Sequence, residues 1–165
     1  MEEIKIDRLP ARYSPVVVIP EHFDELQLPI AGGWGYEKED AVVIFKRDPA
    51  HTSVAPYKAI DIEMQFVKCR LIFELIWTRE HDEKYEDVRW DIAQQKVRRI
   101  EGRTYDVLDL KVSATPRNEW LISKSEWESK DWQSEEEEDL FRINYESKMH
   151  VTNSQFWFDI SDFFN

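Results

Sequence analysis

The segment from residue 57 to residue 77 constrains the fold most, because it is the longest apolar-rich run in the chain and contains neither glycine nor proline. Placed on a helix, its apolar side chains fall on two roughly opposite faces, which predicts a helix covered on two sides. The first face consists of Ile60, Met64, Val67, Leu71 and Leu75, and the second of Ile62, Phe66, Cys69, Phe73 and Trp77. One of the two polar seams between these faces consists of Glu63, Arg70 and Glu74.

As a strand, the same segment would need one bulge, at which the alternation of apolar residues shifts by one position. It would also run for about twenty residues, far beyond the usual five or six. Length therefore favours a helix over residues 57–71. Residues 71–78 are rich in Ile, Phe and Trp, so this part stays open between helix and strand.

The composition is that of a folded, acidic protein. With 165 residues, 42% hydrophobic and 13% aromatic, the chain is expected to form a single domain, 1–165. The net charge of −12 argues against binding to nucleic acid and to anionic membrane surfaces, both of which attract basic proteins. It is compatible with a basic protein partner, but an acidic protein that its own charge keeps dispersed is the more common case.

The single cysteine, Cys69, excludes an internal disulfide, and its place in the apolar segment predicts a small core side chain. The first residues lack the basic and apolar regions of a signal peptide, and no run is long enough to span a membrane. The cytoplasm is therefore the expected compartment.

Apolar runs bounded by proline, glycine or charged turns predict the strands. They cover residues 16–19 (between Pro15 and Pro20, and expected to be covered on both faces), 41–45, 87–99, 103–115 and 155–160. Residues 87–115 read as one long antiparallel hairpin with a basic tip around Glu101-Gly102. The extended residues 4–9 are expected to pair weakly with a sheet edge.

Two further helices are predicted after the hairpin. The first covers residues 119–129 with Asn118 as its N-cap, and the second covers 135–149 with a capping box from Ser134 to Glu137. The predicted fold class is therefore α+β: a mostly antiparallel sheet of five or six strands with two or three helices packed against it.

Residues 31–36 hold three of the four glycines of the chain. They do not form a phosphate loop, because the Gly-Lys-Ser/Thr ending is missing and no clear helix follows. The favoured interpretation is a tight connection with Trp34 and Tyr36 packed on the core. The alternative is a binding loop that presents these two side chains.

No catalytic motif stands out. The histidines form no short-spaced pair, and His81-Asp82-Glu83 points its side chains in different directions, so no metal and no cofactor are predicted. An enzyme would need carboxylates brought together by the fold, such as Glu63 or Glu74 with Asp109.

The charge pattern is more informative than the motifs. Residues 118–139 hold nine acids against two lysines, a net charge of −7, with three tryptophans between them. One interpretation is a solvated helical face whose tryptophans point inward. The other is an acidic, aromatic surface for a basic protein, because such charges speed association and select partners by sign. The candidate partner-binding residues are Trp127, Trp132, Glu135, Glu136, Glu137, Glu138 and Asp139, with Trp34 as an outlier.

Two runs carry a family resemblance. Residues 32–36 (GGWGY), followed by 39–44 (EDAVVI), and the turn at 101–106 (EGRTYD) resemble segments of small bacterial proteins, including immunity-type proteins encoded beside secreted toxins. The resemblance covers about a tenth to a fifth of the chain. It implies a small, acidic, cytosolic, non-enzymatic protein that blocks a toxin by binding it. The class shares no binding motif, so it implies no particular site residue.

Three hypotheses follow. The first is a non-enzymatic protein-binding module, such as an inhibitor of a basic toxin domain. The second is a small α+β enzyme or ligand-binding protein with a pocket near the 31–36 glycine loop. The third is a subunit of a homo-oligomer whose aromatic residues form the interface.

Overall fold

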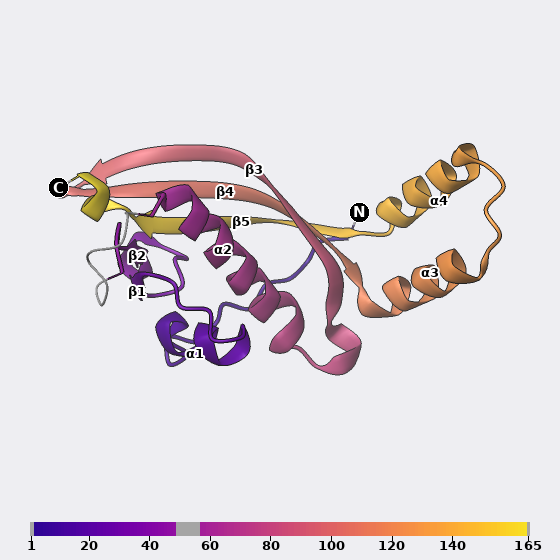
Figure 1. Ribbon diagram of the computed structural model, residues 1–165, viewed down its shortest axis with the longest axis horizontal. Helices are drawn as coiled ribbons and strands as arrows, with labels where there is room; N and C mark the ends of the chain where they lie inside the picture. Colours follow the sequence, from indigo (N-terminus) through magenta and orange to yellow (C-terminus); the bar gives the residue numbers. More distant parts are fainter. Residues whose placement is uncertain (1, 49–56, 165) are drawn as a thin grey trace.

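The computed structural model describes residues 2–48 and 57–164, which form four α-helices and a five-stranded sheet (Figure 1). The helices are α1 (Pro15–His22), α2 (Ala59–Ile72), α3 (Arg117–Ser129) and α4 (Glu135–Ser147). The strands are β1 (Ile30–Gly32), β2 (Val42–Ile44), β3 (Tyr85–Ile100), β4 (Arg103–Pro116) and β5 (His150–Asp159).

The strand order in the sheet is β1-β2-β5-β4-β3. Only β2 and β5 pair in parallel, and every other neighbouring pair is antiparallel. The α+β class with a mostly antiparallel sheet is therefore confirmed. The long β3–β4 hairpin is also as predicted, with Ile100 opposite Arg103 at its tip.

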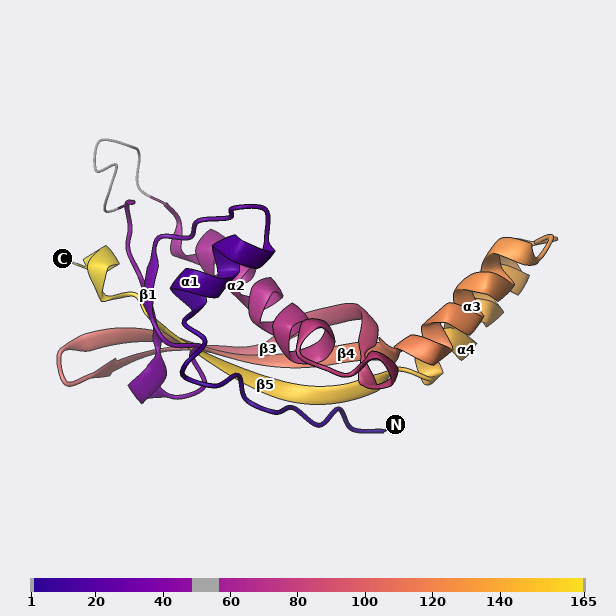
Figure 2. The same ribbon diagram turned by 90° about the horizontal axis from the view of Figure 1, so that it is seen from below.

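The predicted lead-in at the N-terminus does contact the sheet edge. Val151 of β5 accepts a hydrogen bond from Ile4 and donates one to Glu2, which forms a short parallel bridge. Figure 2 shows this segment running beside β5. Ile4 is buried there, so the N-terminal segment covers part of the core.

The core lies between the sheet and α2, which runs along one sheet face (Figures 1 and 2). Phe66 and Val67 of α2 and Leu108 and Leu110 of β4 are completely buried in it. The predicted helix over 57–71 is confirmed, with its start at Ala59. Its predicted polar seam is not at the surface, however: Glu63, Arg70 and Glu74 are 1–2% exposed.

Residues 71–78, which the sequence did not assign to either helix or strand, continue the helix as far as Trp77. Residues Phe73–Trp77 form a π-helical turn, in which the Thr78 amide donates to the Phe73 carbonyl five residues earlier. The Thr78 hydroxyl donates to the same carbonyl at 2.7 Å. Such turns occur mostly inside α-helices and frequently at functional sites.

The predicted strand at 16–19 is wrong, because these residues belong to α1. Pro15 stands at the first helical position, where its fixed φ suits a helix and its missing N–H removes no bond. Val16 and Val17 are exposed rather than covered. The β-branched residues therefore favoured a strand, but the proline and the lack of a covering layer decided for a helix.

The two helices that follow β4 form a hairpin, α3–α4, which extends beyond the end of the sheet (Figures 1 and 2). Here α3 begins directly after β4, so its N-cap is Pro116 and not the predicted Asn118. At the start of α4, Ser134 accepts a hydrogen bond from the Glu137 amide as predicted. The Glu137 carboxylate reaches the Gln133 amide and not the Ser134 amide, so the capping box is only half formed.

Every helix in the part of the chain that the structure describes is too short or too polar to cross a membrane.

Candidate functional site

The glycine loop, residues 31–36, is held tightly against the sheet. A side chain on Gly32, which has φ +84°, would overlap the Ala41 carbonyl oxygen. One on Gly35, with φ +81°, would come within 2.9 Å of the Trp157 carbonyl oxygen. The Trp157 amide donates to the Gly35 carbonyl at 2.8 Å. The glycines are therefore needed for close backbone approach.

This loop delivers Trp34 and Tyr36 into the protein interior. Trp34 is 2% exposed and packs against Phe66 and Phe73, and its indole N–H donates to the Tyr13 carbonyl. The Tyr36 hydroxyl donates to Glu74 Oε2 at 2.6 Å. The structure therefore places Trp34 in the core and packs the partly buried Tyr36 against it, as the favoured interpretation of the loop expected.

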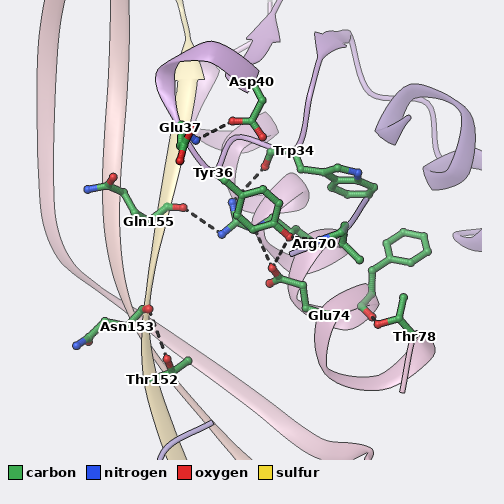
Figure 3. Close-up of polar contacts among 12 residues, drawn as sticks. Trp34, Tyr36, Glu37, Asp40, Arg70, Glu74, Thr78, Thr152, Asn153 and Gln155 are labelled. Atoms are coloured by element: carbon green, nitrogen blue, oxygen red, sulfur yellow. Dashed lines mark hydrogen bonds and ion pairs between the residues drawn. The ribbon is translucent and has the colours of Figure 1, made fainter. Parts of the chain in front are cut away.

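Arg70 lies at the centre of a buried network that joins three elements (Figure 3). Its guanidinium donates to the carbonyls of Trp34 (3.1 Å) and Gln155 (3.0 Å), in the glycine loop and in β5. Its Nε lies 3.4 Å from Glu74 Oε2. The guanidinium is also stacked between the rings of Tyr36 (4.0 Å) and Phe156 (3.6 Å).

Burial dominates the electrostatics of this network, because both charged forms lose their hydration. It lowers the pKa of Arg70 and raises the pKa of Glu74, and in each case the partner's charge opposes the shift. Burial also raises the pKa of Tyr36, with the Glu74 charge acting in the same direction. Glu74 Oε1 is buried without a hydrogen-bond partner in the described chain.

A second buried pair joins α2 to β4. Burial first, and then the neighbouring Asp106 carboxylate, raises the pKa of Glu63 to about 9. Burial thus favours the neutral form of the Glu63 carboxyl beside Asp106, and Asp106 also accepts a hydrogen bond from Gln95. Asp109, the partner suggested by the sequence, instead accepts a hydrogen bond from Gln155.

A cavity of about 550 Å³ lies between the N-terminal segment, α1 and the π-helical turn. We call it the aromatic cavity, because Trp34, Phe73 and Trp77 form part of its wall. Glu74 of the Arg70 network lines it as well. Figure 3 shows Trp34 and Thr78 on one side of Glu74. The volume of the aromatic cavity is in the range of small-molecule sites, about 300–1,000 Å³.

The second candidate region is the α3–α4 hairpin, whose inner side has a small aromatic cluster. The ring centroids of Trp127, Trp132 and Phe141 lie 4.6–5.4 Å apart. Trp127 and Trp132 therefore pack mainly within the hairpin, although Trp127 remains 43% exposed. A hollow of about 210 Å³ lies beside them, lined by both helices.

Ion pairs link the two halves of the hairpin at both of its ends. Lys130 pairs with Glu137 at the tip (2.9 Å), and Lys148 with Glu119 at the base (3.7 Å). The base is anchored to the sheet by Tyr145, whose hydroxyl donates to Asp87 at 2.8 Å. The hairpin is thus a defined arm and not a loose insertion.

The predicted acidic residues occupy the first turn of α4, where a helix favours negative charge. The Gln133 amide donates to the Glu137 carboxylate and Lys130 pairs with it, and both lower the pKa of Glu137. Asp139 pairs with Arg142. The remaining acids, Glu135, Glu136 and Glu138, have no ion pair in the described chain. The structure thus gathers Trp127, Trp132 and the acids 135–139 on the arm. Trp34 lies in the rest of the protein, which comprises the sheet, α1, α2 and the N-terminal segment and which we call the body.

The arm also exposes apolar side chains that the sequence analysis did not single out. Leu121, Ile122, Leu140 and Ile143 are 49–67% exposed. On α4, Leu140 and Ile143 are three residues apart and therefore neighbours on the helix surface. The helical periodicity of the sequence could have identified Leu140 and Ile143, because these residues fall outside the helical stripe that contains Phe141 and Tyr145.

Among the described residues, no group of three or more His, Cys, Asp or Glu side chains is arranged to hold a metal ion. The His81–Glu83 segment forms a short 3-10 turn at the surface.

Comparisons of the chain with models of protein families, with curated proteins and with solved structures found no match.

Proposed function

We propose that this protein is a non-enzymatic binding module that docks a basic protein partner on the α3–α4 arm. The observation that carries the proposal is the projection of the arm beyond the sheet (Figure 1). The arm carries exposed aliphatic side chains and acids that form no ion pair within the described chain. The main core lies in the body, between the sheet and α2. An element that does not cover this core is available to a partner.

The charge of the arm favours a basic partner. Over half of the net charge of −12 lies in residues 118–139. Such a surface steers an oppositely charged protein and speeds its association. The exposed Leu121, Ile122, Leu140 and Ile143 would add apolar contact, which a purely solvated helical face does not provide.

The immunity-type resemblance supports one version of this proposal, an inhibitor that acts in the cytoplasm on a basic toxin domain. Inhibition by binding needs no catalytic residue in the chain. It needs an interface of roughly 1,200–2,000 Å² of total buried surface. The arm would supply the charged part of that interface.

The test is capture and kinetics with a charge-reversed arm. The variant Glu135→Lys, Glu136→Lys, Glu138→Lys changes the three acids that lack ion pairs and leaves the capping residue Glu137 in place. The wild-type chain is first used to capture a partner from the organism that encodes it. Association rates of that purified partner are then measured at several salt concentrations. We expect the variant to associate at least about 10-fold more slowly, with a weaker salt dependence.

The matched control carries the same change of charge on the body: Glu21→Lys, Asp24→Lys, Glu25→Lys, at and just after the end of α1. It should associate like the wild type. Equal association of the arm variant and the wild type would refute the arm as docking element. Capture of nothing but the chain itself would favour a homo-oligomer.

A further inference from the structure

We propose that the aromatic cavity binds a small organic amine that has an apolar body. The apolar body would lie on the aromatic wall and the ammonium group at the acidic rim. This inference does not rest on the proposed function, because the cavity belongs to the body and the docking surface belongs to the arm.

The wall of the cavity is a set of closely packed rings. Phe73 and Trp77 meet edge to face with ring centroids 5.0 Å apart, and Trp34 lies 5.5 Å from Phe73. His22 of α1 closes the group at 5.3 Å from Phe73. Ring faces and edges of this kind suit an apolar body, and tryptophan faces also attract organic cations.

The π-helical turn shapes this wall. It contains both Phe73 and Trp77, and Arg79 donates to the Glu74 carbonyl just beyond it. Trp77 remains 39% exposed although it contacts Phe73, Phe23 and His22. A large aromatic side chain is therefore held at the mouth by neighbouring rings, with part of its surface open to a ligand.

The rim is acidic. Asp7, Glu80 and Glu83 line the cavity from the N-terminal segment and from the turn after α2. They are exposed, and none of them has an ion pair within the described chain. An ammonium group at the mouth would therefore meet carboxylates that form no ion pair within the described chain.

The two arginines of the lining do not reverse this balance. Arg8 donates to Glu37 and lies over the Tyr36 ring, and Arg79 donates to the carbonyls of Glu74 and Lys5. The charge of Arg8 is balanced by Glu37, whereas Arg79 donates only to neutral carbonyls and leaves one positive charge beside the three rim carboxylates. Glu74, which also lines the cavity, keeps one buried oxygen that no donor in the described chain satisfies. The chemistry left over is acceptor chemistry, which selects a cationic donor.

The experiment compares two probes with the same apolar body and opposite charge: 4-phenylbutylamine and 4-phenylbutyrate. Binding to the full chain is followed by isothermal titration calorimetry at low salt. We expect the amine to bind at least about 10-fold more tightly than the carboxylate, because the carboxylate meets like charges at the rim. Equal affinities, or no binding of the amine at millimolar concentration, would overturn the proposal.

Two variants locate the binding. Glu80→Lys with Glu83→Lys changes only exposed rim residues. This variant should bind the amine about 10-fold more weakly, and its preference for the amine over the carboxylate should be smaller than that of the wild type. Trp77→Leu should weaken both probes. The matched controls lie on the arm: Glu135→Lys with Glu138→Lys, and Trp127→Leu, whose tryptophan is similarly exposed. Amine binding that the arm variants reduce as much as the cavity variants do would contradict the assignment.

Discussion

At the scale of single residues, the buried charges of α2 set this protein apart. Glu63, Arg70 and Glu74 share one polar seam of the helix, and the fold turns that seam toward the sheet and the glycine loop. Isolated charges there would be very unfavourable, so each one is neutralised or paired. Glu63 keeps a proton next to Asp106, and Arg70 is paired with Glu74.

The proton on Glu63 predicts a pH dependence of stability. Its pKa in the folded protein, about 9, lies above the ordinary value of 4.5, so folding takes up a proton between these pH values. The stabilisation is complete below pH 4.5 and is lost as the pH rises through about 9. In urea unfolding, we expect the wild type to lose up to about 1.4 kcal/mol per pH unit relative to Glu63→Gln in this window. The variant Glu21→Gln, at an exposed site, should follow the wild type. Parallel curves for the wild type and Glu63→Gln would contradict a protonated Glu63.

Arg70 predicts a large loss on substitution. Arg70→Met removes the charge that Glu74 faces and the donors that two carbonyls accept. We expect it to lower the free energy of unfolding by about 3–5 kcal/mol. The exposed pair Arg142–Asp139 provides the control, since Arg142→Met should cost less than about 1 kcal/mol. A double variant, Arg70→Met with Glu74→Met, should be less destabilised than Arg70→Met alone, because it leaves no unpaired buried charge.

Two glycines with similar positive φ distinguish the cost of backbone strain from the cost of steric overlap. Gly32 and Gly102 have φ of +84° and +80°, but only Gly32 has atoms within contact distance of an added side chain. Gly102→Ala should cost about 1 kcal/mol from strain. Gly32→Ala should cost more than about 3 kcal/mol, because the Ala41 carbonyl must move as well. If chemical denaturation gave similar losses of the free energy of unfolding for both variants, the backbone of the glycine loop would be able to adjust at little energetic cost.

At the scale of elements, the arm and the π-helical turn show how local geometry serves the surface. The arm has its own aromatic cluster, formed by Trp127, Trp132 and Phe141, and its own ion pairs. Its contacts with the sheet lie at the base, where Tyr145 reaches Asp87 and Thr115. Its helices are therefore stabilised largely by each other and, in α4, by the Ser134 cap.

The N-cap of α4 is accordingly expected to matter for the arm. Ser134→Ala removes the acceptor of the Glu137 amide and should destabilise the arm by about 1 kcal/mol. Hydrogen exchange of the α4 amides should become about five-fold faster, while that of the β4 amides stays unchanged. Ser125→Ala, at an exposed position inside α3, is the matched control and should leave exchange unchanged. Equal acceleration in β4 would show that the arm and the body unfold together.

At the scale of the whole molecule, charge is distributed between two ends. The tip of the β3–β4 hairpin carries Lys96, Arg98 and Arg99, and the acidic arm lies at the opposite end (Figures 1 and 2). The core of the body lies between them. This separation suggests that the arm and the body have separate tasks.

Removing the arm tests that separation. Replacing residues 116–148 by Asn-Gly joins the paired ends of β4 and β5 through a two-residue turn. We expect the shortened chain to fold cooperatively and to keep amine binding, because the aromatic cavity is lined entirely by residues before β3. It should lose the basic partner. Circular dichroism, calorimetry with the amine and partner capture check the three outcomes. Loss of the folded body would show that the arm is part of the core structure.

Several features of the fold followed from the sequence alone. The length and apolar character of residues 57–71 predicted α2, the alternation in residues 87–115 predicted the β3–β4 hairpin, and Ser134 predicted the start of α4. These signals are local, because helix and strand periods and caps depend on neighbouring residues. The fold class followed from the order of these elements.

Long-range packing decided the rest. The polar seam of α2 turned inward because Tyr36, Asp106 and Gln155 supply its partners from distant parts of the chain. The aromatic cavity joins residues from the N-terminal segment, α1, the glycine loop and the π-helical turn. The sequence thus determined most of the elements and the acidic segment, because periodicity, caps and charge can be read locally. Only the tertiary structure decided which charges are buried and where the cavity forms, because both depend on which distant segments meet.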